Sequence, residues 1–376
     1  MPLVLNEEQN MLKDAAKDFC TNSTPITQLR KLRDDKDESG FDRDTWQQMV
    51  ELGWSGIIIP EDFGGLGFGH MGMGVVMEEC GRTLTSSPLF ASAVLGASAL
   101  IHGGSDEDKA ELLPQVAGGE LLLALALEDS PHHNPYGTSV TAEACGAGYK
   151  VTGSKKFVLD GHVANKMVVV ARSSGNSGDR DGLTLVLVDG DAAGVTTTRT
   201  IMADSRNAAN MEFAGAEGTL VGQAGKGADV LDRVLDAGRI LLAAEMLGSL
   251  QECFERTIEY LKTREQFGVP IGSFQALKHR AAKMFCEIEL SKSVVLEGLS
   301  ALDEGRDDVS ELASLVKARL NDTYNLVASE GVQMHGGIGM TDEHEIGFFL
   351  KRSRVSEHTL GNSAFHRNRY GELLGY

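Results

Sequence analysis

A group of polar residues in the last third of the sequence has the side-chain types needed to hold a phosphate-containing ligand. Arg264 carries a guanidinium fork that can pair with two phosphate oxygens, and Gln275 offers both a donor and an acceptor. Gln333 is followed by Gly336 and Gly337, where the absence of a Cβ lets backbone approach a ligand closely. Taken alone, Arg264 would be read as a solvated charge at a helix end. The combination instead predicts a site for a pyrophosphate, and the aromatic side chain of Phe267 could pack against the same ligand.

Acid–base candidates are few. Glu245 stands on an apolar helical face, where a lone buried carboxylate is costly. Three alternatives stay open for it: a catalytic base, a buried partner of an Arg or Lys, or a partly solvated side chain. His335 and His344 have no neighbours in the sequence that complete a ligand set, so we expect structural roles for both and no metal site.

The elements that must position these residues follow a helical, then β, then helical order. We expect an α+β fold, mostly α, with an N-terminal helical domain (1–120), a middle β-barrel-like domain (121–226) and a C-terminal four-helix bundle (227–376). Residues 228–263 contain no proline and could form one helix about 50 Å long. The other helical patterns cover 6–20, 43–52, 70–83, 88–103, 106–117, 273–303, 308–332 and 343–357.

Composition excludes several classes of protein. A net charge of −19 argues against binding nucleic acid, which needs clustered Lys and Arg. No apolar run approaches the ~20 residues that span a bilayer, and the segment from Met1 to Glu8 has no basic leader, so we expect neither membrane insertion nor a secretion signal. The odd number of widely spaced cysteines favours reduced, mostly buried thiols in a cytoplasmic protein; they are Cys20, Cys80, Cys145, Cys253 and Cys286.

The motifs and the domain plan together resemble the acyl-CoA dehydrogenase family over nearly the whole chain. The resemblance rests on Arg264-Glu265-Gln266-Phe267-Gly268 with Gln275, on the segment from Gln333 to Gly339, and on the segment from Gly53 to Gly67. It implies FAD as cofactor, an acyl-CoA thioester as substrate, and an electron-transfer flavoprotein or similar acceptor. In the family, the set around Arg264, Gln275 and Gln333 grips the ADP end of an FAD whose flavin ring lies mainly in a neighbouring subunit.

The sequence departs from the family where the chemistry occurs. The family usually has Tyr-Glu-Gly-Thr at its catalytic glutamate, and the corresponding residues here are Thr359-Leu360-Gly361-Asn362. The alternative base position of some members falls on Gly238. Neither Leu360 nor Gly238 can take a proton. Asp160 and Glu357 are weaker candidates than Glu245.

The flavin-ring side departs as well. The hydroxyl that the family places near flavin N5 falls on Leu159, which has no side-chain donor. Phe157 replaces a tryptophan and can still stack, with a smaller surface. The segment 127–135 has lost the Gly-Ser pair that supplies close backbone donors in typical members.

Two hypotheses follow. In the first, the chain is the non-catalytic subunit of a heteromer, such as a heterotetramer, and completes the FAD site of a catalytic acyl-CoA dehydrogenase-type partner. Family heteromers of this kind act on CoA thioesters of steroid side chains and other bulky acids. In the second, it is a catalytic homo-oligomer, such as a homotetramer, with Glu245 as a relocated base. The joint loss of ring and base residues, while the nucleotide-side residues persist, favours the heteromer.

Overall fold

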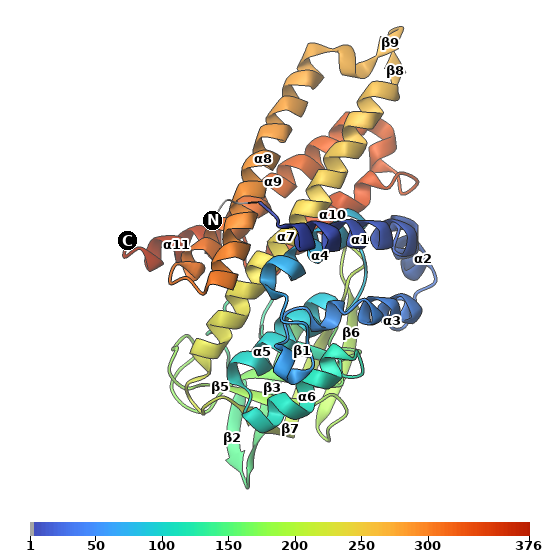
Figure 1. Ribbon diagram of the computed structural model, residues 1–376. Helices are drawn as coiled ribbons and strands as arrows, with labels where there is room; N and C mark the ends of the chain where they lie inside the picture. The colour runs from blue at the N-terminus through green and yellow to red at the C-terminus, as the bar shows by residue number, and fades with distance from the viewer. Residues whose placement is uncertain (1–3) are drawn as a thin grey trace. The chain divides into compact units, whose positions relative to one another are not determined.

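The helices and strands of the computed structural model follow the predicted order, and the predicted fold class is confirmed (Figure 1). The structure describes residues 4–376, so Met1, Pro2 and Leu3 of the N-terminal argument lie outside it. The N-terminal elements are α1 (Glu7–Ser23), α2 (Ile26–Asp34), α3 (Arg43–Glu51), η1 (Trp54–Gly56), η2 (Glu61–Phe63), α4 (Gly69–Arg82), the π-helix η3 (Leu89–Gly96), α5 (Ala97–Gly103) and α6 (Asp106–Ala117). No helix within the described residues is long and apolar enough to cross a membrane.

Local capping explains why several of these helices begin where they do. The Asn6 side chain accepts from the backbone N–H of Gln9 while the Gln9 side chain accepts from the N–H of Asn6, which is a capping box. Ser105 and Asp108 form the same arrangement at the start of α6. These bonds satisfy N–H groups that the first helical turn leaves without an intrahelical partner.

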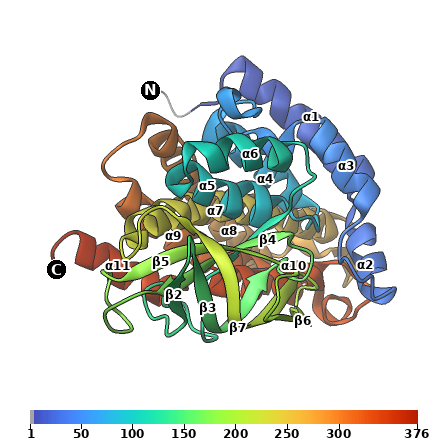
Figure 2. The ribbon, with the colours of Figure 1, turned by 90° about the horizontal axis from the view of Figure 1, so that it is seen from below.

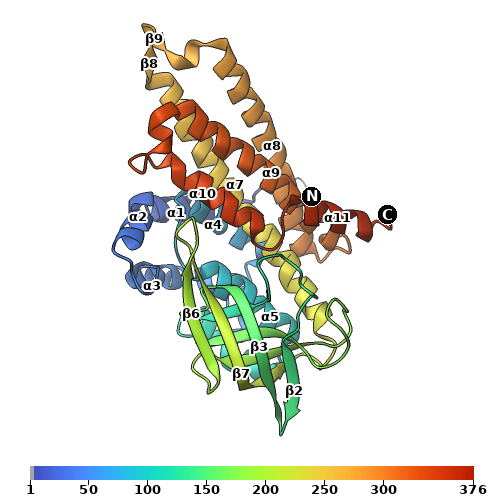
Figure 3. The same cartoon turned by 180° about the vertical axis from the view of Figure 1, so that it is seen from behind.

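The middle of the chain forms a sheet that closes on itself. Its strands are β1 (Leu123–Ala126), β2 (Thr141–Cys145), β3 (Gly148–Leu159), β4 (Lys166–Arg172), β5 (Leu183–Asp189), β6 (Val195–Ile201) and β7 (Asn207–Val221). Pairing runs β4–β2–β3–β7–β5 and returns from β5 to β4, while β1 and β6 pair with β4 and β7. The antiparallel neighbours β3 and β7 are visible side by side in Figures 2 and 3.

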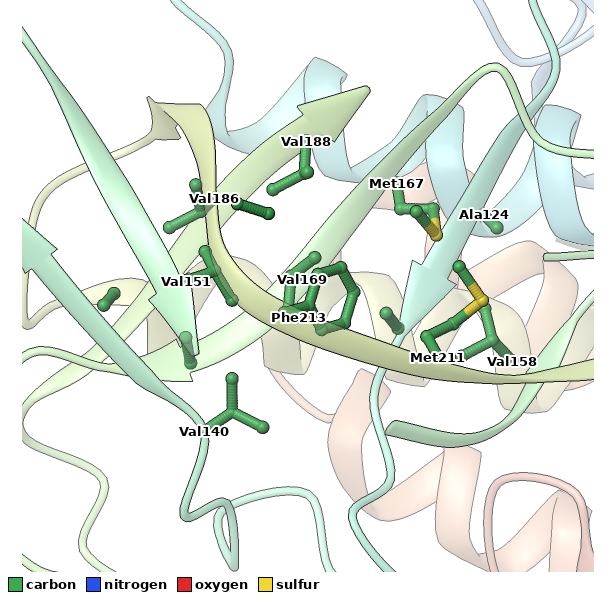
Figure 4. Packing of buried hydrophobic residues seen from close by; sticks show 14 of the residues in the cluster. Ala124, Val140, Val151, Val158, Met167, Val169, Val186, Val188, Met211 and Phe213 are labelled. Atoms are coloured by element: carbon green, nitrogen blue, oxygen red, sulfur yellow. The ribbon is translucent and has the colours of Figure 1, made fainter. Parts of the chain in front are cut away.

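Side chains from these strands make a continuous apolar core. Val151 of β3, Val186 of β5 and Phe213 of β7 are all buried and belong to one cluster (Figure 4). Within β3 the buried residues are Val151, Lys155 and Val158, and the rest of the strand is exposed or half-buried. Two register shifts between β3 and β7, near Val151 and between Lys155 and Val158, interrupt the ladder.

The C-terminal part is helical, and it contains one α-helix, two short strands and two 3-10 helices that were not predicted. It contains α7 (Gly227–Thr263), the short hairpin strands β8 (Glu265–Gln266) and β9 (Val269–Pro270), η4 (Ile271–Ser273), α8 (Gln275–Glu304), α9 (Val309–His335), η5 (Gly336–Met340), α10 (Ile346–His358) and α11 (Ser363–Leu373). We did not predict α11, because only Ser363 and His366 of its residues are buried and it carries no apolar stripe. The limits of the three sequence-predicted domains stay predictions.

Contacts divide the chain into two compact units whose limits cut across the sequence order. Unit 1 contains residues 1–31, 70–85 and 239–376, and unit 2 contains 32–69 and 86–238. Within unit 1, α4 and α7 approach so closely that a Cβ at Gly81 would lie 1.9 Å from the Glu245 carbonyl oxygen. Glycine is therefore required at this crossing.

Candidate functional site

The position where the family keeps its base lies in a constrained turn between α10 and α11. Leu360 has φ 57°, a left-handed conformation that is uncommon for a residue with a branched side chain. Its carbonyl oxygen accepts hydrogen bonds from His366 Nε2 at 3.0 Å and from Arg239 Nε at 3.4 Å. Both donors are buried. These two hydrogen bonds therefore fix the backbone of Leu360 and leave its side chain uninvolved.

A second buried cation fixes the same turn from α9. Lys317 is fully buried, and its Nζ donates to the carbonyl oxygens of Ser356 and Gly361 at 2.8 and 3.1 Å and to Asn321 Oδ1 at 2.7 Å. Burial lowers the pKa of Lys317 well below 10.5. Sequence reasoning missed this residue. The available signal was a lysine next to Val316 and three residues before Leu320 on a helix that must bury one face.

Neither residue at the two expected base positions has a side chain that can accept a proton. Leu360 is 7% exposed and carries only hydrocarbon. Gly238, the alternative position, lies inside α7 directly before Arg239. Removal of an α-proton requires a base within hydrogen-bond reach of that proton, and neither residue has an acceptor in its side chain.

Glu245 is buried and paired, the second of its three alternatives. Its Oε1 accepts from Arg352 Nη1 at 2.9 Å, and the two side chains are 3% and 1% exposed. Arg352 also donates to the Leu84 carbonyl oxygen at 3.4 Å. Since this carboxylate is engaged by a guanidinium in the interior of unit 1, its geometry is that of a structural ion pair.

The two weaker acid–base candidates, Glu357 and Asp160, lie in different parts of the fold. Glu357 lies on α10, and its Oε2 accepts from Asn325 Nδ2 at 2.7 Å. Asp160 follows β3 with φ 50° in a turn, where its backbone N–H donates to the Asn207 carbonyl oxygen at 3.2 Å.

The first half of the predicted nucleotide site surrounds the β8–β9 hairpin, which connects α7 to α8 (Figure 1). Arg264, Phe267 and Gln275 are exposed there, and Phe267 is 92% exposed with φ 56°. The ring of Phe267 meets that of Phe274 edge to face at 6.1 Å. Gln275 is the first residue of α8, a helix start without a side-chain cap. These groups are available to a ligand outside the chain.

The second half lies where α9 ends. Gln333, Gly336 and Gly337 are exposed, and Gly336 has φ 63°. A Cβ built at either glycine would meet nothing within 4 Å, so their backbone faces open space that a ligand could enter.

Tyr260 and His335 bring these two halves together. The Tyr260 carbonyl oxygen accepts from the Arg264 N–H at 2.8 Å, and the Tyr260 hydroxyl donates to the His335 carbonyl oxygen at 3.3 Å. Their rings stack at 4.3 Å, and His344 packs on His335 at 4.6 Å. Burial lowers the pKa of both histidines, so they are neutral aromatic groups. Sequence reasoning missed Tyr260, although it lies one turn before Arg264.

The ring side of the predicted site lies in unit 2 and lacks a side-chain donor at the expected place. Leu159 is half-buried at the end of β3. Phe157 is 42% exposed with φ 51°, so its ring remains available for stacking. The residues therefore fit the nucleotide end of an FAD, and Leu159 offers no side-chain donor to its flavin ring.

A buried ion pair anchors the segment 127–135, which we predicted to lie on the flavin-ring side. Lys155 Nζ, fully buried, donates to Asp129 Oδ1 at 2.7 Å and to the Leu127 carbonyl oxygen at 2.8 Å. Burial lowers the pKa of Lys155 to about 8, against the opposing effect of Asp129. Asp129 also accepts from the Ser139 N–H at 2.6 Å. The Asp129 carboxylate therefore bonds to Lys155 and Ser139. Residues 4–376 contain no cluster of side chains suited to a metal ion.

Comparison with known proteins gives one consistent family. The acyl-CoA dehydrogenase N-terminal, middle and C-terminal domains match residues 6–120, 129–214 and 225–374. The probable acyl-CoA dehydrogenase YngJ of Bacillus subtilis (strain 168) is 29% identical over 98% of this chain and 98% of its own. Among solved structures, a variant of the Tcur3481-Tcur3483 steroid ACAD is 30% identical over 98% of both chains, with a TM-score of 0.88. The ChsE4-ChsE5 complex from Mycobacterium tuberculosis is 27% identical over 100% of this chain and 99% of that chain, with a TM-score of 0.90.

Proposed function

Because the chain belongs to the acyl-CoA dehydrogenase family, a family of FAD-dependent oxidoreductases acting on CH–CH bonds, we propose that it is the non-catalytic subunit of a heteromeric acyl-CoA dehydrogenase. Its catalytic partner would be a second chain of the same family that carries the base and the flavin-ring site.

The observation that carries this proposal is the turn at Leu360. Three buried groups, Arg239, Lys317 and His366, still hold the backbone of the turn, yet the side chain it presents has no proton acceptor. α,β-Dehydrogenation removes the α-proton while hydride leaves Cβ, so a chain without a base cannot complete the reaction at its own site.

The nucleotide-side residues that match the family could complete an FAD site in a partner subunit. Arg264, Gln275 and Gln333 are exposed and chemically suited to a pyrophosphate and its nucleotide. We propose that they hold the ADP end of an FAD whose ring lies in the partner, with Phe267, Gly336 and Gly337 lining the approach. When bound, FAD accepts the hydride from Cβ and passes its electrons to an electron-transfer flavoprotein or similar acceptor.

The substrate class follows from the same proposal. The Tcur3481-Tcur3483 steroid ACAD and the ChsE4-ChsE5 complex are each named for two components. A CoA thioester of a bulky acid, such as a steroid side chain, is therefore the substrate we propose for the assembled enzyme.

The test is to purify this chain alone and together with a family member whose glutamate is intact. Alone, it should hold little flavin and show negligible acyl-CoA dehydrogenation with an artificial electron acceptor. Co-expressed with the right partner, it should co-purify as a yellow complex that turns over. A yellow homotetramer of this chain with one flavin per subunit and normal turnover would refute the proposal.

The alternative, a catalytic homo-oligomer, depends on Glu245. Glu245→Gln keeps the size of the side chain but cannot accept the α-proton. If Glu245 were the base, turnover would fall by at least ~10²-fold while flavin content stayed normal. The ion pair with Arg352 leads us to expect no such fall.

A further inference from the structure

Two cysteines far apart in the sequence lie together in the interior of unit 1. Cys20 of α1 and Cys80 of α4 have their sulfur atoms 3.9 Å apart, and both are buried. Polar groups lie next to the pair: Thr24, at the end of α1, donates to the Cys20 carbonyl oxygen at 3.1 Å and shares a hydrogen bond at 2.8 Å with Thr85, which follows α4. A disulfide requires the sulfurs to close to about 2.05 Å, which is a movement of about 1 Å for each.

A cavity adjoins this pair. It has a volume of about 410 Å³ and is lined by Cys20 together with charged side chains that include Lys17, Glu79 and Arg256. Lys17 is exposed, so part of the cavity's wall is in contact with solvent. A molecule the size of water or hydrogen peroxide could therefore reach the Cys20 side of the pair.

We propose that Cys20 and Cys80 form a reversible dithiol–disulfide site, which hydrogen peroxide oxidises through this cavity and which ties α1 to α4 when oxidised. In the first step the Cys20 sulfur attacks one peroxide oxygen, the O–O bond breaks, and sulfenic acid and water form. In the second step the Cys80 sulfur displaces the hydroxyl of the sulfenic acid, forming the S–S bond and a second water. The two thiols lose two electrons and two protons, and the peroxide is reduced.

The surroundings assign different roles to the two thiols. The hydrogen bond with Cys20, followed by burial, raises the pKa of Cys80 well above its usual range, so Cys80 is a poor first nucleophile. Cys20 lines the cavity and is the site of first attack. Cys80 then acts as the resolving thiol, because its sulfur lies 3.9 Å from that of Cys20.

The other cysteines supply matched controls. Cys145 and Cys286 are exposed, so their replacement by serine removes competing surface reactions. Cys253 is buried like the pair, but its thiol contacts the Val327 carbonyl oxygen at 3.8 Å. Oxidation of Cys253 would therefore show that the oxidant reaches buried thiols through general opening of the fold.

The experiment treats the folded Cys145→Ser/Cys286→Ser chain with hydrogen peroxide and maps its peptides without reduction. We expect a mass loss of about 2 Da and a Cys20 peptide linked to a Cys80 peptide, reversed by dithiothreitol. The linked chain should also melt at a higher temperature, because the bond joins residues 60 positions apart. In Cys80→Ser, Cys20 should accumulate as a sulfenic acid that dimedone labels; in Cys20→Ser, Cys80 should stay reduced.

Two results would overturn the proposal, and neither depends on the serine variants of the pair. One is recovery of Cys20 and Cys80 as free thiols under conditions that oxidise Cys145 and Cys286 in the unmodified chain. The other is oxidation of Cys253 at the same rate as Cys20, which would mean that general opening admits the oxidant.

Discussion

Glu79 should make the stability of the protein depend on pH in a predictable direction. This residue of α4 is 3% exposed, and its carboxylate oxygens lie 3.9 Å from Lys13 Nζ and 3.8 Å from Arg82 Nε, beyond hydrogen-bonding distance. Burial, and then the charge of Glu78, raise the pKa of Glu79 from 4.5 to about 7. The folded protein therefore holds the proton more tightly than the unfolded chain does.

The size of the effect follows from this difference. The stability that protonated Glu79 contributes is fully present below about pH 4.5 and is lost as the pH rises through about 7. A difference of about 2.5 pKa units corresponds to about 3 kcal/mol of unfolding free energy, of which about 2.5 kcal/mol falls between about pH 5 and about pH 8. Glu79→Gln mimics the protonated acid and should remove this dependence.

The assay is urea unfolding of the wild-type chain and Glu79→Gln at both pH values. The variant should be more stable than wild type near pH 8 by about 3 kcal/mol, and the difference should shrink to less than about 1 kcal/mol near pH 5. Glu120→Gln, at an exposed position, is the control and should show no such change. A Glu79→Gln variant that is less stable than wild type at the higher pH would show that the ionised carboxylate is a net stabilising group and would refute the reasoning.

Three further predictions concern the nucleotide site, the vacant base position and the buried ion pair. In the complex with a catalytic partner, Arg264→Ala should weaken flavin binding ~10- to 100-fold, equivalent to ~1.5–3 kcal/mol, and Gln275→Ala should weaken it by about 1 kcal/mol. Flavin absorbance per heterodimer after gel filtration measures both effects. Full flavin occupancy in the Arg264 variant would place the site elsewhere. Leu360→Glu in the same complex should add no turnover, because Leu159 supplies no side-chain donor for a flavin ring in this chain; a gain of acyl-CoA turnover would contradict the assignment of this subunit. Arg352→Met removes the guanidinium that pairs with the buried Glu245 carboxylate and should lower the unfolding free energy by about 3–5 kcal/mol, whereas adding Glu245→Gln should recover most of the loss. A fall of less than about 1 kcal/mol in the single variant would mean that the pair contributes little to stability.

Much of the fold could be predicted because its signals are local. The spacing of apolar residues predicted a helix over 106–117, and α6 occupies Asp106–Ala117 because Ser105 caps its first turn. What could not be predicted has weak local signals. The strands β8 and β9 have two residues each, too few for an alternation to appear, and α11 buries little surface.

The candidate site divides in the same way. The missing base could be inferred from Leu360 once the family resemblance had assigned that position to the base, because residue type decides whether a side chain can accept a proton. The contact that holds the turn could not be predicted from the sequence. Lys317 and Gly361 are 44 positions apart, and the lysine bonds to a backbone oxygen, which every residue has. For Glu245 the sequence indicated a choice of environments, but its partner Arg352 lies 107 positions away.

The division of the chain into two units has a consequence for how the protein is made. α1 and α4 belong to unit 1, most of which begins only at Arg239, so both helices are synthesised long before the residues that complete their unit. Unit 2, which ends at Gly238, has all of its residues by then and can fold first. During that interval the backbone of α4 at Gly81, which later packs against Glu245, stays uncovered. Nascent chains arrested between these points should therefore show a protease-resistant barrel together with a protease-sensitive α1 and α4. The segment from 70 to 85 is where we expect a chaperone to bind during synthesis.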